Sequence, residues 1–199
     1  ILTVVISLAA GLAYRRSFKF SGTVFYITVA SLIVPSILIT LGIGLMFDRL
    51  NIEATWYTSG MGAHLTWTLP FGLLIMFAIF NRFDKSYEEA ARDLGATPWQ
   101  VMRFVVIPII TPSLVGIGLF GFTLSFDEFA RSLLSVGSKN TLPLEIFGMT
   151  TTVTTPTLYA LGTVTTAVSF LIIGLSFSTI ALIERRRRRH GSDAGQGMV

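Results

Sequence analysis

Charged residues are scarce in this sequence. They make up 13% of its 199 residues, whereas soluble domains carry about 25%, and hydrophobic residues make up 52%. The apolar residues gather in runs of about twenty, the length that crosses a bilayer as a helix, so the sequence predicts an all-α, polytopic membrane protein. Cysteine is absent, which excludes disulfide bonds and any metal or redox site built on cysteine.

Several nucleotide-binding and catalytic motifs are missing as well. No GxxxxGK[ST] segment occurs, so the chain does not bind ATP through a phosphate loop, and ATP-driven work would need a partner. No HExxH or GxSxG segment occurs, His64 and His190 are the only histidines, and Asp127 has no second aspartate within a predicted span. These absences argue against an intramembrane enzyme and favour a helix-packing role for His64 over metal binding.

Five membrane spans are predicted, and the first is truncated. The chain starts with Ile and stays apolar to Tyr14, a length that rises about 21 Å as a helix against a hydrocarbon core of about 30 Å. We therefore expect this span to begin before residue 1. Pro35 and Pro70 predict kinks in two of the later spans. The four later spans are Val24–Phe47, Gly62–Phe80, Ser113–Ser135 and Leu158–Ile183.

The basic residues give an orientation. Twelve of the fifteen Lys and Arg residues fall in segments 15–19, 82–103 and 185–189, which five crossings put on one side. By the positive-inside rule that side is cytoplasmic, so the loop 83–110 and a basic tail, 184–199, are expected there. The tail could bind nucleic acid, but a basic run beside a span is more typical of an anchor at anionic lipid. We expect membrane lipid, and no nucleic acid, as its partner.

The loop 83–110 is far longer than the usual connection of about four to six residues, and it begins with helix signals. Ser86 and Glu89 are spaced as a capping box, and Glu88 is spaced to pair with Arg92 one turn later. Gly95 is the residue type that ends a helix in the left-handed conformation. These signals predict a short helix that stops at a bend.

A second helix is predicted directly after the bend. Thr97 and Gln100 form another capping box, and Pro98 stands at the favoured first helical position. Pro108 is expected to end this helix, before Thr111-Pro112 opens the next span. The sequence therefore predicts two short helices joined by a sharp turn.

One face of the first short helix is suited to contact. Tyr87, Ala90, Ala91 and Leu94 lie on a single stripe, in which two small residues separate two large ones. Such a shallow apolar surface fits a groove of another protein. The alternative is an amphipathic helix at the lipid surface that packs only on its own bundle.

The same segment carries a longer pattern. Glu89-Ala90-Ala91 is followed after three residues by Gly95 and, after nine more, by Val105-Val106-Ile107-Pro108. This pattern resembles the cytoplasmic EAA loop of type I ABC importer permeases, which reads Glu-Ala-Ala, three residues, Gly, nine residues, Ile, any residue, Leu, Pro. Val105 and Ile107 replace the usual Ile and Leu with residues of similar shape.

The resemblance implies a mechanical role for this loop. In the family, the first short helix is a coupling helix that docks in a cleft of the ATP-hydrolysing subunit, and closure of two such subunits tilts the spans. The resemblance assigns coupling to Glu89, Ala90, Ala91 and Gly95. With them we expect Pro108, which closes the pattern, and Tyr87 and Leu94, which lie on the same stripe, to take part.

The resemblance also implies partners and missing sequence. It implies a dimer of ATPase subunits, a second permease subunit and an extracytoplasmic substrate-binding protein, with ATP and Mg on the ATPase and no cofactor on this chain. The binding protein is expected to dock at a short helix near residues 144–149. Such permeases lie in the inner membrane and usually have six spans, so the first span and part of the second are expected to be absent from this chain.

Two acidic residues and an arginine fall inside the span predicted to begin at Ser113. A charge at the bilayer centre costs about 2.5–3.5 kcal/mol, so Asp127 and Glu128 should face the bundle interior or an aqueous cavity. One interpretation is structural, because Arg131 is spaced to pair with either carboxylate. The other is functional, because two carboxylates and one guanidinium leave a net negative site that helps a cation to pass.

A second resemblance concerns the substrate. Ser125-Phe126-Asp127-Glu128-Phe129 resembles the SFDEF or SFDDF segment of spermidine/putrescine importer permeases. It implies polyamine transport, with Phe126, Asp127 and Glu128 on the substrate pathway. Permeases for opines, other organic cations and some anions share parts of this pattern, and Arg131 departs from it, so another small solute is the alternative. A passive channel is a further class, but it would have no use for a docking loop.

Overall fold

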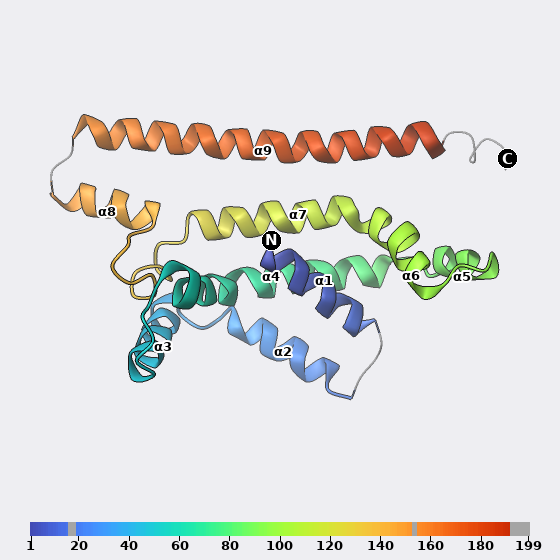
Figure 1. Cartoon of the computed structure of the whole chain (residues 1–199), viewed down its shortest axis with the longest axis horizontal. Helices are drawn as coiled ribbons and strands as arrows, with labels where there is room; N and C mark the ends of the chain where they lie inside the picture. The colour runs from blue at the N-terminus through green and yellow to red at the C-terminus, as the bar shows by residue number, and fades with distance from the viewer. Residues whose placement is uncertain (16–18, 153–154, 192–199) are drawn as a thin grey trace.

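The structure, a computed structural model, describes residues 1–15, 19–152 and 155–191, and its regular elements there are all helical (Figure 1). This confirms the predicted all-α class. The helices are α1 (Leu2–Tyr14), α2 (Ser21–Ser31), α3 (Ser36–Arg49), α4 (Met61–Arg82), α5 (Ser86–Asp93), α6 (Pro98–Val101), α7 (Ile107–Phe126), α8 (Leu142–Thr152) and α9 (Pro156–Gly191), with π-helical turns η1 (Trp56–Gly60) and η2 (Met102–Val106).

Three helical stretches among the described residues are long and apolar enough to cross a membrane: Trp56–Arg82, Pro98–Phe126 and Pro156–Ile183. The helices α2 and α3 are long and apolar enough only when taken together, and they are bent by 102° at the break between them, as in a broken span or a re-entrant loop. The bend falls at Pro35, directly before α3, as the predicted kink requires. Because α1 is shorter than a full crossing, the number of five spans stays a prediction.

The helix α4 lies at the centre of the bundle and packs against α1 and α7. It runs through Pro70 without ending there. The contact with α1 is close, because a Cβ built on Gly72 would lie 2.3 Å from Ser7 Oγ and one on Gly11 would lie 2.9 Å from the Phe80 ring. The buried apolar cluster joins α4 to α7 and to the segment before it, and comprises Met76, Val101, Val106, Ile110 and Ile117.

The second short helix does not end at Pro108, so that prediction was wrong. The helix α6 runs through η2 directly into α7, whose first turn contains Pro108 and whose interior contains Pro112. A proline lacks the amide hydrogen and crowds the carbonyl four residues earlier. For Pro108 that carbonyl belongs to Phe104 in the π turn η2, whose wider ring accommodates the proline without ending the helix. The span therefore begins well before the predicted Ser113.

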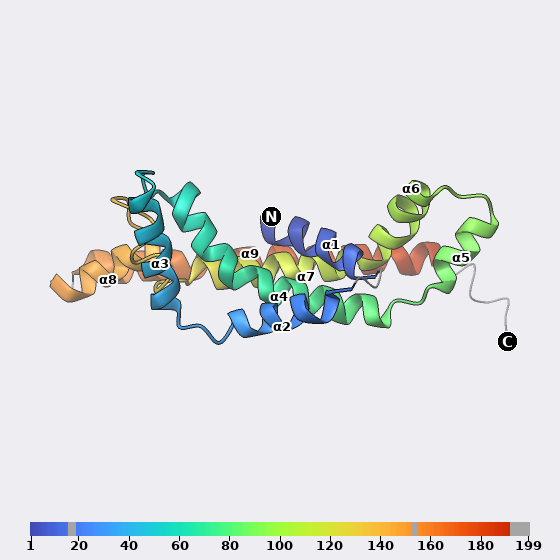
Figure 2. The same cartoon turned by 90° about the horizontal axis from the view of Figure 1, so that it is seen from below.

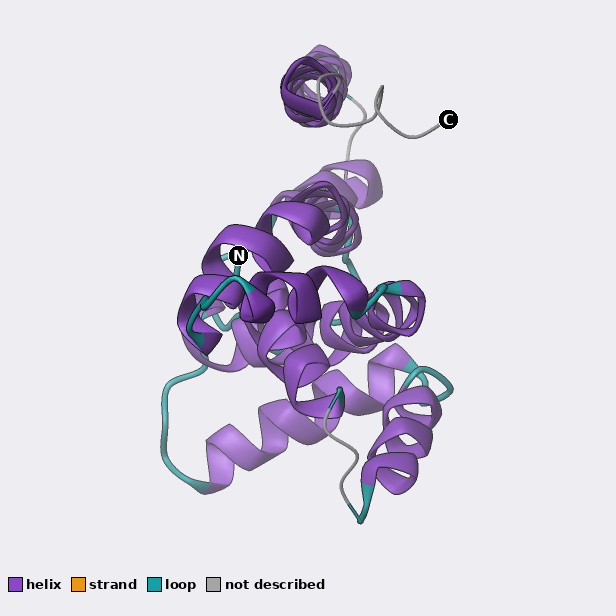
Figure 3. Ribbon diagram, turned by 90° about the vertical axis from the view of Figure 1, so that its right-hand side faces the viewer, coloured by secondary structure: helices purple, strands orange, loops and turns teal. Residues whose placement is uncertain are grey.

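The two ends of the bundle carry different elements. Figures 1 and 2 put α5 and α6 at one end, called the α5 end here, and α3 and α8 at the other, called the α3 end. The C-terminal part of α9 lies toward the α5 end, and Figure 3 shows α9 end-on and apart from most of the bundle. The short helix predicted near residues 144–149 exists and is α8.

Candidate functional site

The α5 end carries the segment that resembles a coupling helix. The helix α5 begins at Ser86, and its N-cap residue is Lys85. The amide of Ser86 donates to Asp84 Oδ1 at 2.9 Å, and this bond holds the pKa of the Asp84 carboxyl below its usual value because it favours the charged form. The predicted Ser86–Glu89 capping box does not form, since Asp84 supplies the acceptor instead.

The helix α5 ends in the predicted left-handed glycine. Gly95 has a φ of 84°. Its amide donates to the Arg92 carbonyl at 2.8 Å, and the Ala96 amide donates to the Ala91 carbonyl at 3.0 Å. These two bonds form a Schellman motif, which satisfies the last carbonyls of α5 and turns the chain sharply.

The second short helix, α6, begins after the bend as predicted. The Gln100 side chain accepts from the Thr97 amide at 2.8 Å, and the Thr97 hydroxyl accepts from the Gln100 amide at 3.4 Å, with Pro98 at the first helical position. This capping box fixes the start of α6. Two residues separate the bend at Gly95 from Pro98, where the helix restarts, and from there the backbone is helical without a break through the membrane-spanning α7.

The four residues of the predicted contact stripe on α5 do not all face the solvent. Leu94 is 89% exposed, and Tyr87 and Ala90 are exposed as well. Ala91 is half-buried and packs against the apolar cluster of the bundle. Beyond the bend Trp99 and Phe104 are exposed as well, and Phe104 lines a shallow hollow together with Leu94. One alanine of the pair therefore anchors the helix, and the rest of the stripe is available to a partner.

Two acidic neighbours on α5 differ in their surroundings. The predicted pair of Glu88 and Arg92 forms at 3.5 Å. Glu88 also pairs with Arg15 of α1, a contact that the sequence pattern did not indicate. Glu89 is exposed and lines a cavity of about 850 Å³ between α1 and the segment α5–α6. Only Glu89 of these two carboxylates is thus free of an ion pair within the described residues.

The α3 end holds the acidic residues predicted to lie inside a span, and here the structure differs from the prediction. The helix α7 ends at Phe126, and Asp127 is its C-cap residue. Asp127 and Glu128 therefore stand in the turn that follows the helix, and the span does not reach Ser135 as predicted. Turns and irregular backbone connect the end of α7 to the start of α8.

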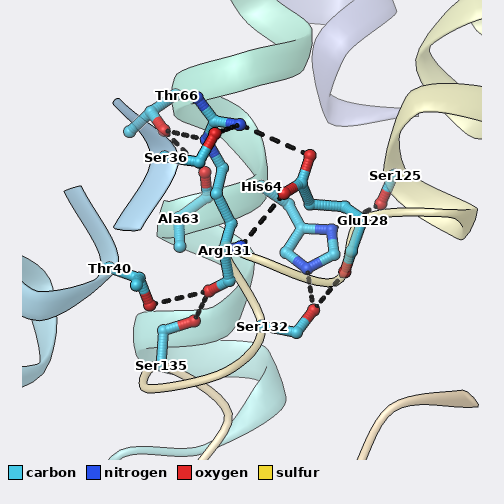
Figure 4. A network of polar contacts seen from close by, with 10 residues as sticks. All are labelled: Ser36, Thr40, Ala63, His64, Thr66, Ser125, Glu128, Arg131, Ser132 and Ser135. Atoms are coloured by element: carbon cyan, nitrogen blue, oxygen red, sulfur yellow. Dashed lines mark hydrogen bonds and ion pairs between the residues drawn. The ribbon is translucent and has the colours of Figure 1, made fainter. Parts of the chain in front are cut away.

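Arg131 is the centre of a buried polar network, shown in Figure 4. Its side chain is 1% exposed and pairs with Glu128, Nη1 to Oε2, at 3.3 Å. The Nη1 group also donates to Ser36 Oγ at 2.8 Å, and Nε donates to Thr66 Oγ1 at 3.3 Å. The guanidinium lies over the Trp67 ring, 4.4 Å from its centroid. The Arg131 cluster thus joins α3, α4 and the turn after α7.

His64 has a structural place beside this cluster. Its Nε2 lies 2.9 Å from Ser132 Oγ and its Nδ1 lies 2.8 Å from Ser125 Oγ. The Ser132 hydroxyl donates to the Glu128 carbonyl, so it must accept from Nε2, and Nδ1 then accepts from Ser125. No metal-binding group of three or more His, Asp or Glu side chains occurs among the described residues.

The backbone of Arg131 is held as firmly as its side chain. Its carbonyl accepts from the hydroxyls of Thr40, at 2.9 Å, and Ser135. Its amide donates to Glu128 Oε1 at 3.0 Å. The sequence pattern identified the pair with Glu128 as one alternative, but it missed the hydroxyl partners on α3 and α4; their one signal was the presence of Ser36, Thr40 and Thr66 in apolar helices.

The three residues predicted on a substrate pathway are therefore not equivalent. Glu128 is neutralised by Arg131, whereas Asp127 is exposed and makes no ion pair within the described part of the chain. Phe126 lines a cavity of about 590 Å³ together with His64 and Ser125. The α3 end thus combines an internally paired arginine, the exposed carboxylate of Asp127 and a neighbouring cavity with apolar and hydroxyl lining.

Comparison with known proteins decides the family. Residues 3–189 match the family described as binding-protein-dependent transport system inner membrane component. The chain belongs to this family. The family consists of transport components, which sets aside the intramembrane-enzyme alternative, and together with the apolar helices it makes the chain a multi-pass inner-membrane permease, as the resemblance of the EAA loop indicated.

Several relatives of this permease have descriptive names. It is 31% identical over 175 residues to the spermidine/putrescine transport system permease protein PotC of Haemophilus influenzae, covering 87% of this chain and 68% of that protein. It is 30% identical over 183 residues to the putrescine transport system permease protein PotI of Escherichia coli, covering 89% of this chain and 65% of that protein. The permease thus spans about two thirds of the length of these relatives.

A solved structure shares the fold. The permease aligns with a chain of the MetNI methionine ABC transporter in an inward-facing conformation, with a TM-score of 0.72 and 18% identity. The alignment covers 91% of this chain and 87% of that chain. The arrangement of helices is therefore that of an ABC transporter membrane subunit.

Proposed function

We propose that this permease forms half of the translocation pathway of an ATP-driven importer for polyamines such as spermidine and putrescine. The names of its relatives support the substrate class. The partners we propose are a dimer of ATPase subunits, a second permease subunit and an extracytoplasmic substrate-binding protein. ATP and Mg act on the ATPase, and this chain binds no cofactor.

The observation that carries the proposal is the rigid bend at Gly95. It joins an exposed apolar helix face to a span through a Schellman motif, a capping box and continuous helix. A docking partner that moves α5 therefore also moves α7, which a flexible polar loop would not achieve. In this proposal Tyr87, Ala90 and Leu94 contact the ATPase, Glu89 offers it a charge, and Ala91 anchors α5 to the bundle.

The orientation follows from charge and arrangement. The predicted cytoplasmic segments are the loop 83–110, the basic tail 184–199 and the turn after α1. The first of these, the end of α9 and Arg15 all gather at the α5 end (Figure 1). We therefore place the α5 end in the cytoplasm and the α3 end, with α8, on the side where a binding protein would deliver substrate.

The proposed contact for the substrate is at the α3 end. A polyamine carries positive charges along a slender chain, and Asp127 presents a carboxylate that no cation within the described residues neutralises. Phe126 and the cavity behind it offer apolar surface to the methylene groups. The buried and paired state of Arg131 removes its positive charge from the path, which favours a cationic solute over the anionic alternative.

The test is uptake of radiolabelled spermidine into proteoliposomes that hold the full transporter with its binding protein. We expect uptake that requires ATP and that putrescine competes. Asp127→Asn should raise the apparent KM about fivefold, the equivalent of roughly 1 kcal/mol for one ion pair in water. The matched control is Asp48→Asn, which removes another exposed carboxylate at the α3 end and should leave the KM unchanged.

Two results would contradict the proposal in different ways. Transport of another solute with no competition by polyamines would support the alternative, an importer for an opine, another organic cation or an anion. An unchanged KM in Asp127→Asn, with polyamine uptake intact, would remove Asp127 from the substrate pathway and leave the importer function standing.

A further inference from the structure

Arg15 connects distant parts of the chain at the α5 end. It stands directly after α1, as the C-cap residue of that helix. Its guanidinium donates to Glu88 Oε1, a residue 73 positions later in the chain, in the first turn of α5. The two side chains are 15% and 12% exposed, so the pair is largely removed from solvent.

Two aromatic rings complete the surroundings of Arg15. Its guanidinium carbon lies 5.0 Å from the centroid of the Phe80 ring and 5.0 Å from that of the Phe83 ring. Phe80 belongs to the last turns of α4, and Phe83 follows α4 directly. A guanidinium held against two rings and a carboxylate has little freedom to reorient. Arg15 thus joins the ends of α1 and α4 to the start of α5.

The connection matters because α1 has no other ion pair to the segment α5–α6 among the described residues. The chain itself links α5 to α4 before it and to α7 after it, whereas α1 is separated from α5 by more than seventy residues. Yet α1 packs tightly on α4 at Gly11 and Gly72. A force applied to α5 reaches α1 directly only if a side chain carries it.

We infer that Arg15 is a positioning residue that fastens the coupling helix α5 to the cytoplasmic end of α1, so that displacement of α5 moves α1 together with α4 and α7. This inference rests on the proposed coupling function. Under this inference the two adjacent carboxylates have different roles. Glu88 is held within the chain by Arg15, and Glu89 remains exposed for contact with the ATPase.

Arg92 provides a matched control. It pairs with the other oxygen of the same carboxylate, Glu88 Oε2, at 3.5 Å. Its side chain is 58% exposed and no aromatic contact holds it among the described residues. An exposed i,i+4 pair contributes little because water screens it, so loss of Arg92 should leave α5 in place.

The experiment compares Arg15→Met, Glu88→Gln, their double variant and Arg92→Met in the complete transporter. The measured quantity is the ratio of ATPase activity with loaded binding protein to basal activity, with the amount of co-purified ATPase subunit recorded for each. We expect each of the first two variants to lower the ratio about fivefold, within the usual range of coupling between sites, with the ATPase still bound. Arg92→Met should change the ratio less than about twofold.

The double variant and a conservative variant sharpen the result. If both residues act through one contact, the double variant should be no worse than either single variant. Arg15→Lys keeps the charge but loses the planar contact with the rings, so it should restore part of the ratio. An unchanged ratio in Arg15→Met, additive losses in the double variant, or release of the ATPase by Arg15→Met would each overturn the inference.

A second measurement separates this inference from the proposed function. Hydrogen exchange of the full chain in lipid nanodiscs should show faster exchange of the α5 amides in Arg15→Met and normal exchange in Arg92→Met, whatever the solute is. Unchanged exchange in Arg15→Met would overturn the positioning role even if polyamines are transported. Absence of polyamine-stimulated ATPase in the unaltered transporter would count against the proposed substrate alone.

Discussion

The two ends of α4 each hold an arginine that contacts an aromatic ring and pairs with a glutamate, and the two arrangements differ in kind. Arg131, at the α3 end, has its partner three residues away and adds two hydroxyl acceptors from α3 and α4. Arg15, at the α5 end, has its partner 73 residues away and donates to no hydroxyl group among the described residues. Arg131 therefore belongs to a network of several hydrogen bonds, whereas Arg15 makes a single ion pair between helices that are distant in sequence.

This difference indicates that the α3 end is held more rigidly than the α5 end. The Arg131 guanidinium bonds through Nε and Nη1 to three side chains, and its carbonyl accepts from two hydroxyls, so displacement would break several bonds together (Figure 4). Displacement at the α5 end would strain one ion pair and two ring contacts, while the backbone from Pro98 into α7 stays helical. The comparison predicts stability effects at the α3 end and coupling effects at the α5 end.

The largest expected effect is that of Arg131→Met. The variant leaves Glu128 without its partner in a site where the arginine was buried, and breaking one side of a buried pair costs about 3–5 kcal/mol. We expect the free energy of unfolding in detergent micelles, measured from the loss of helical circular dichroism, to fall by this amount. Polyamine-independent properties such as basal ATPase activity should fall only in proportion to the folded fraction.

Two further variants test this explanation. Arg49→Met removes an exposed arginine from the same end and should be close to neutral. Arg131→Met combined with Glu128→Leu should recover a large part of the loss, because it leaves no unpaired charge. A single variant that unfolds like the unaltered chain would show that the cluster does not hold the α3 end together.

The next prediction compares two glycines with positive φ, Gly137 at the α3 end and Gly95 at the α5 end. Gly137 has a φ of 71°, and a Cβ built on it would lie 2.0 Å from the Ala54 carbonyl oxygen. Gly95 has a φ of 84° and nothing within 4 Å of its Cβ position. Gly137→Ala should therefore cost about 2–4 kcal/mol through strain and collision, and Gly95→Ala about 1–2 kcal/mol through strain alone. Equal losses in the same unfolding measurement would contradict this distinction.

A change at Gly95 should affect coupling as well as stability. Gly95→Val places a β-branched residue where φ is positive, so the Schellman turn should open and separate α5 from α7. We expect the ratio of stimulated to basal ATPase activity to fall about fivefold, the equivalent of roughly 1 kcal/mol of coupling. Gly95→Asn is the control, because asparagine tolerates this conformation; stimulation that survives in Gly95→Val would argue against the bend as the transmitting element.

The smallest expected effect concerns the cap of α6. Thr97→Ala removes the side-chain acceptor for the Gln100 amide, and a lost N-cap costs about 1 kcal/mol. Because α6 continues into α7, the change should appear as faster hydrogen exchange confined to residues 98–102. Thr97→Ser, which keeps the hydroxyl, should exchange like the unaltered chain, and faster exchange throughout α7 would mean that the cap does more than start the helix.

The sequence predicted the features that depend on neighbours along the chain. The turn at Gly95, the capping box of Thr97 and Gln100, and the break at Pro35 each follow from a few adjacent residues, and all three occur. The box of Ser86 and Glu89 failed for an equally local reason, because Asp84 offers a competing acceptor nearby. Local patterns of this kind identify the candidate coupling segment well.

Features that depend on packing were predicted less well. Pro108 was expected to stop a helix, but a π turn accommodates it, and hydropathy could not show that α7 stops at Phe126. Structural pairing of Arg131 with one of the two carboxylates was one of two open interpretations, and spacing alone did not say that Glu128 would be the partner. The contact of Arg15 with Glu88 had no signal at all, because it depends on where two distant helices meet.

The central claim is that the exposed face of α5 seats an ATPase subunit, and cross-linking tests it most directly. Because the sequence contains no cysteine, Leu94→Cys introduces a single thiol at a side chain that is 89% exposed, and Leu41→Cys provides an exposed control at the α3 end. With a photoactivatable maleimide on the thiol, we predict a covalent adduct between the permease and the ATPase subunit from position 94 and none from position 41. An ATPase that co-purifies but never cross-links to position 94 would contradict the account.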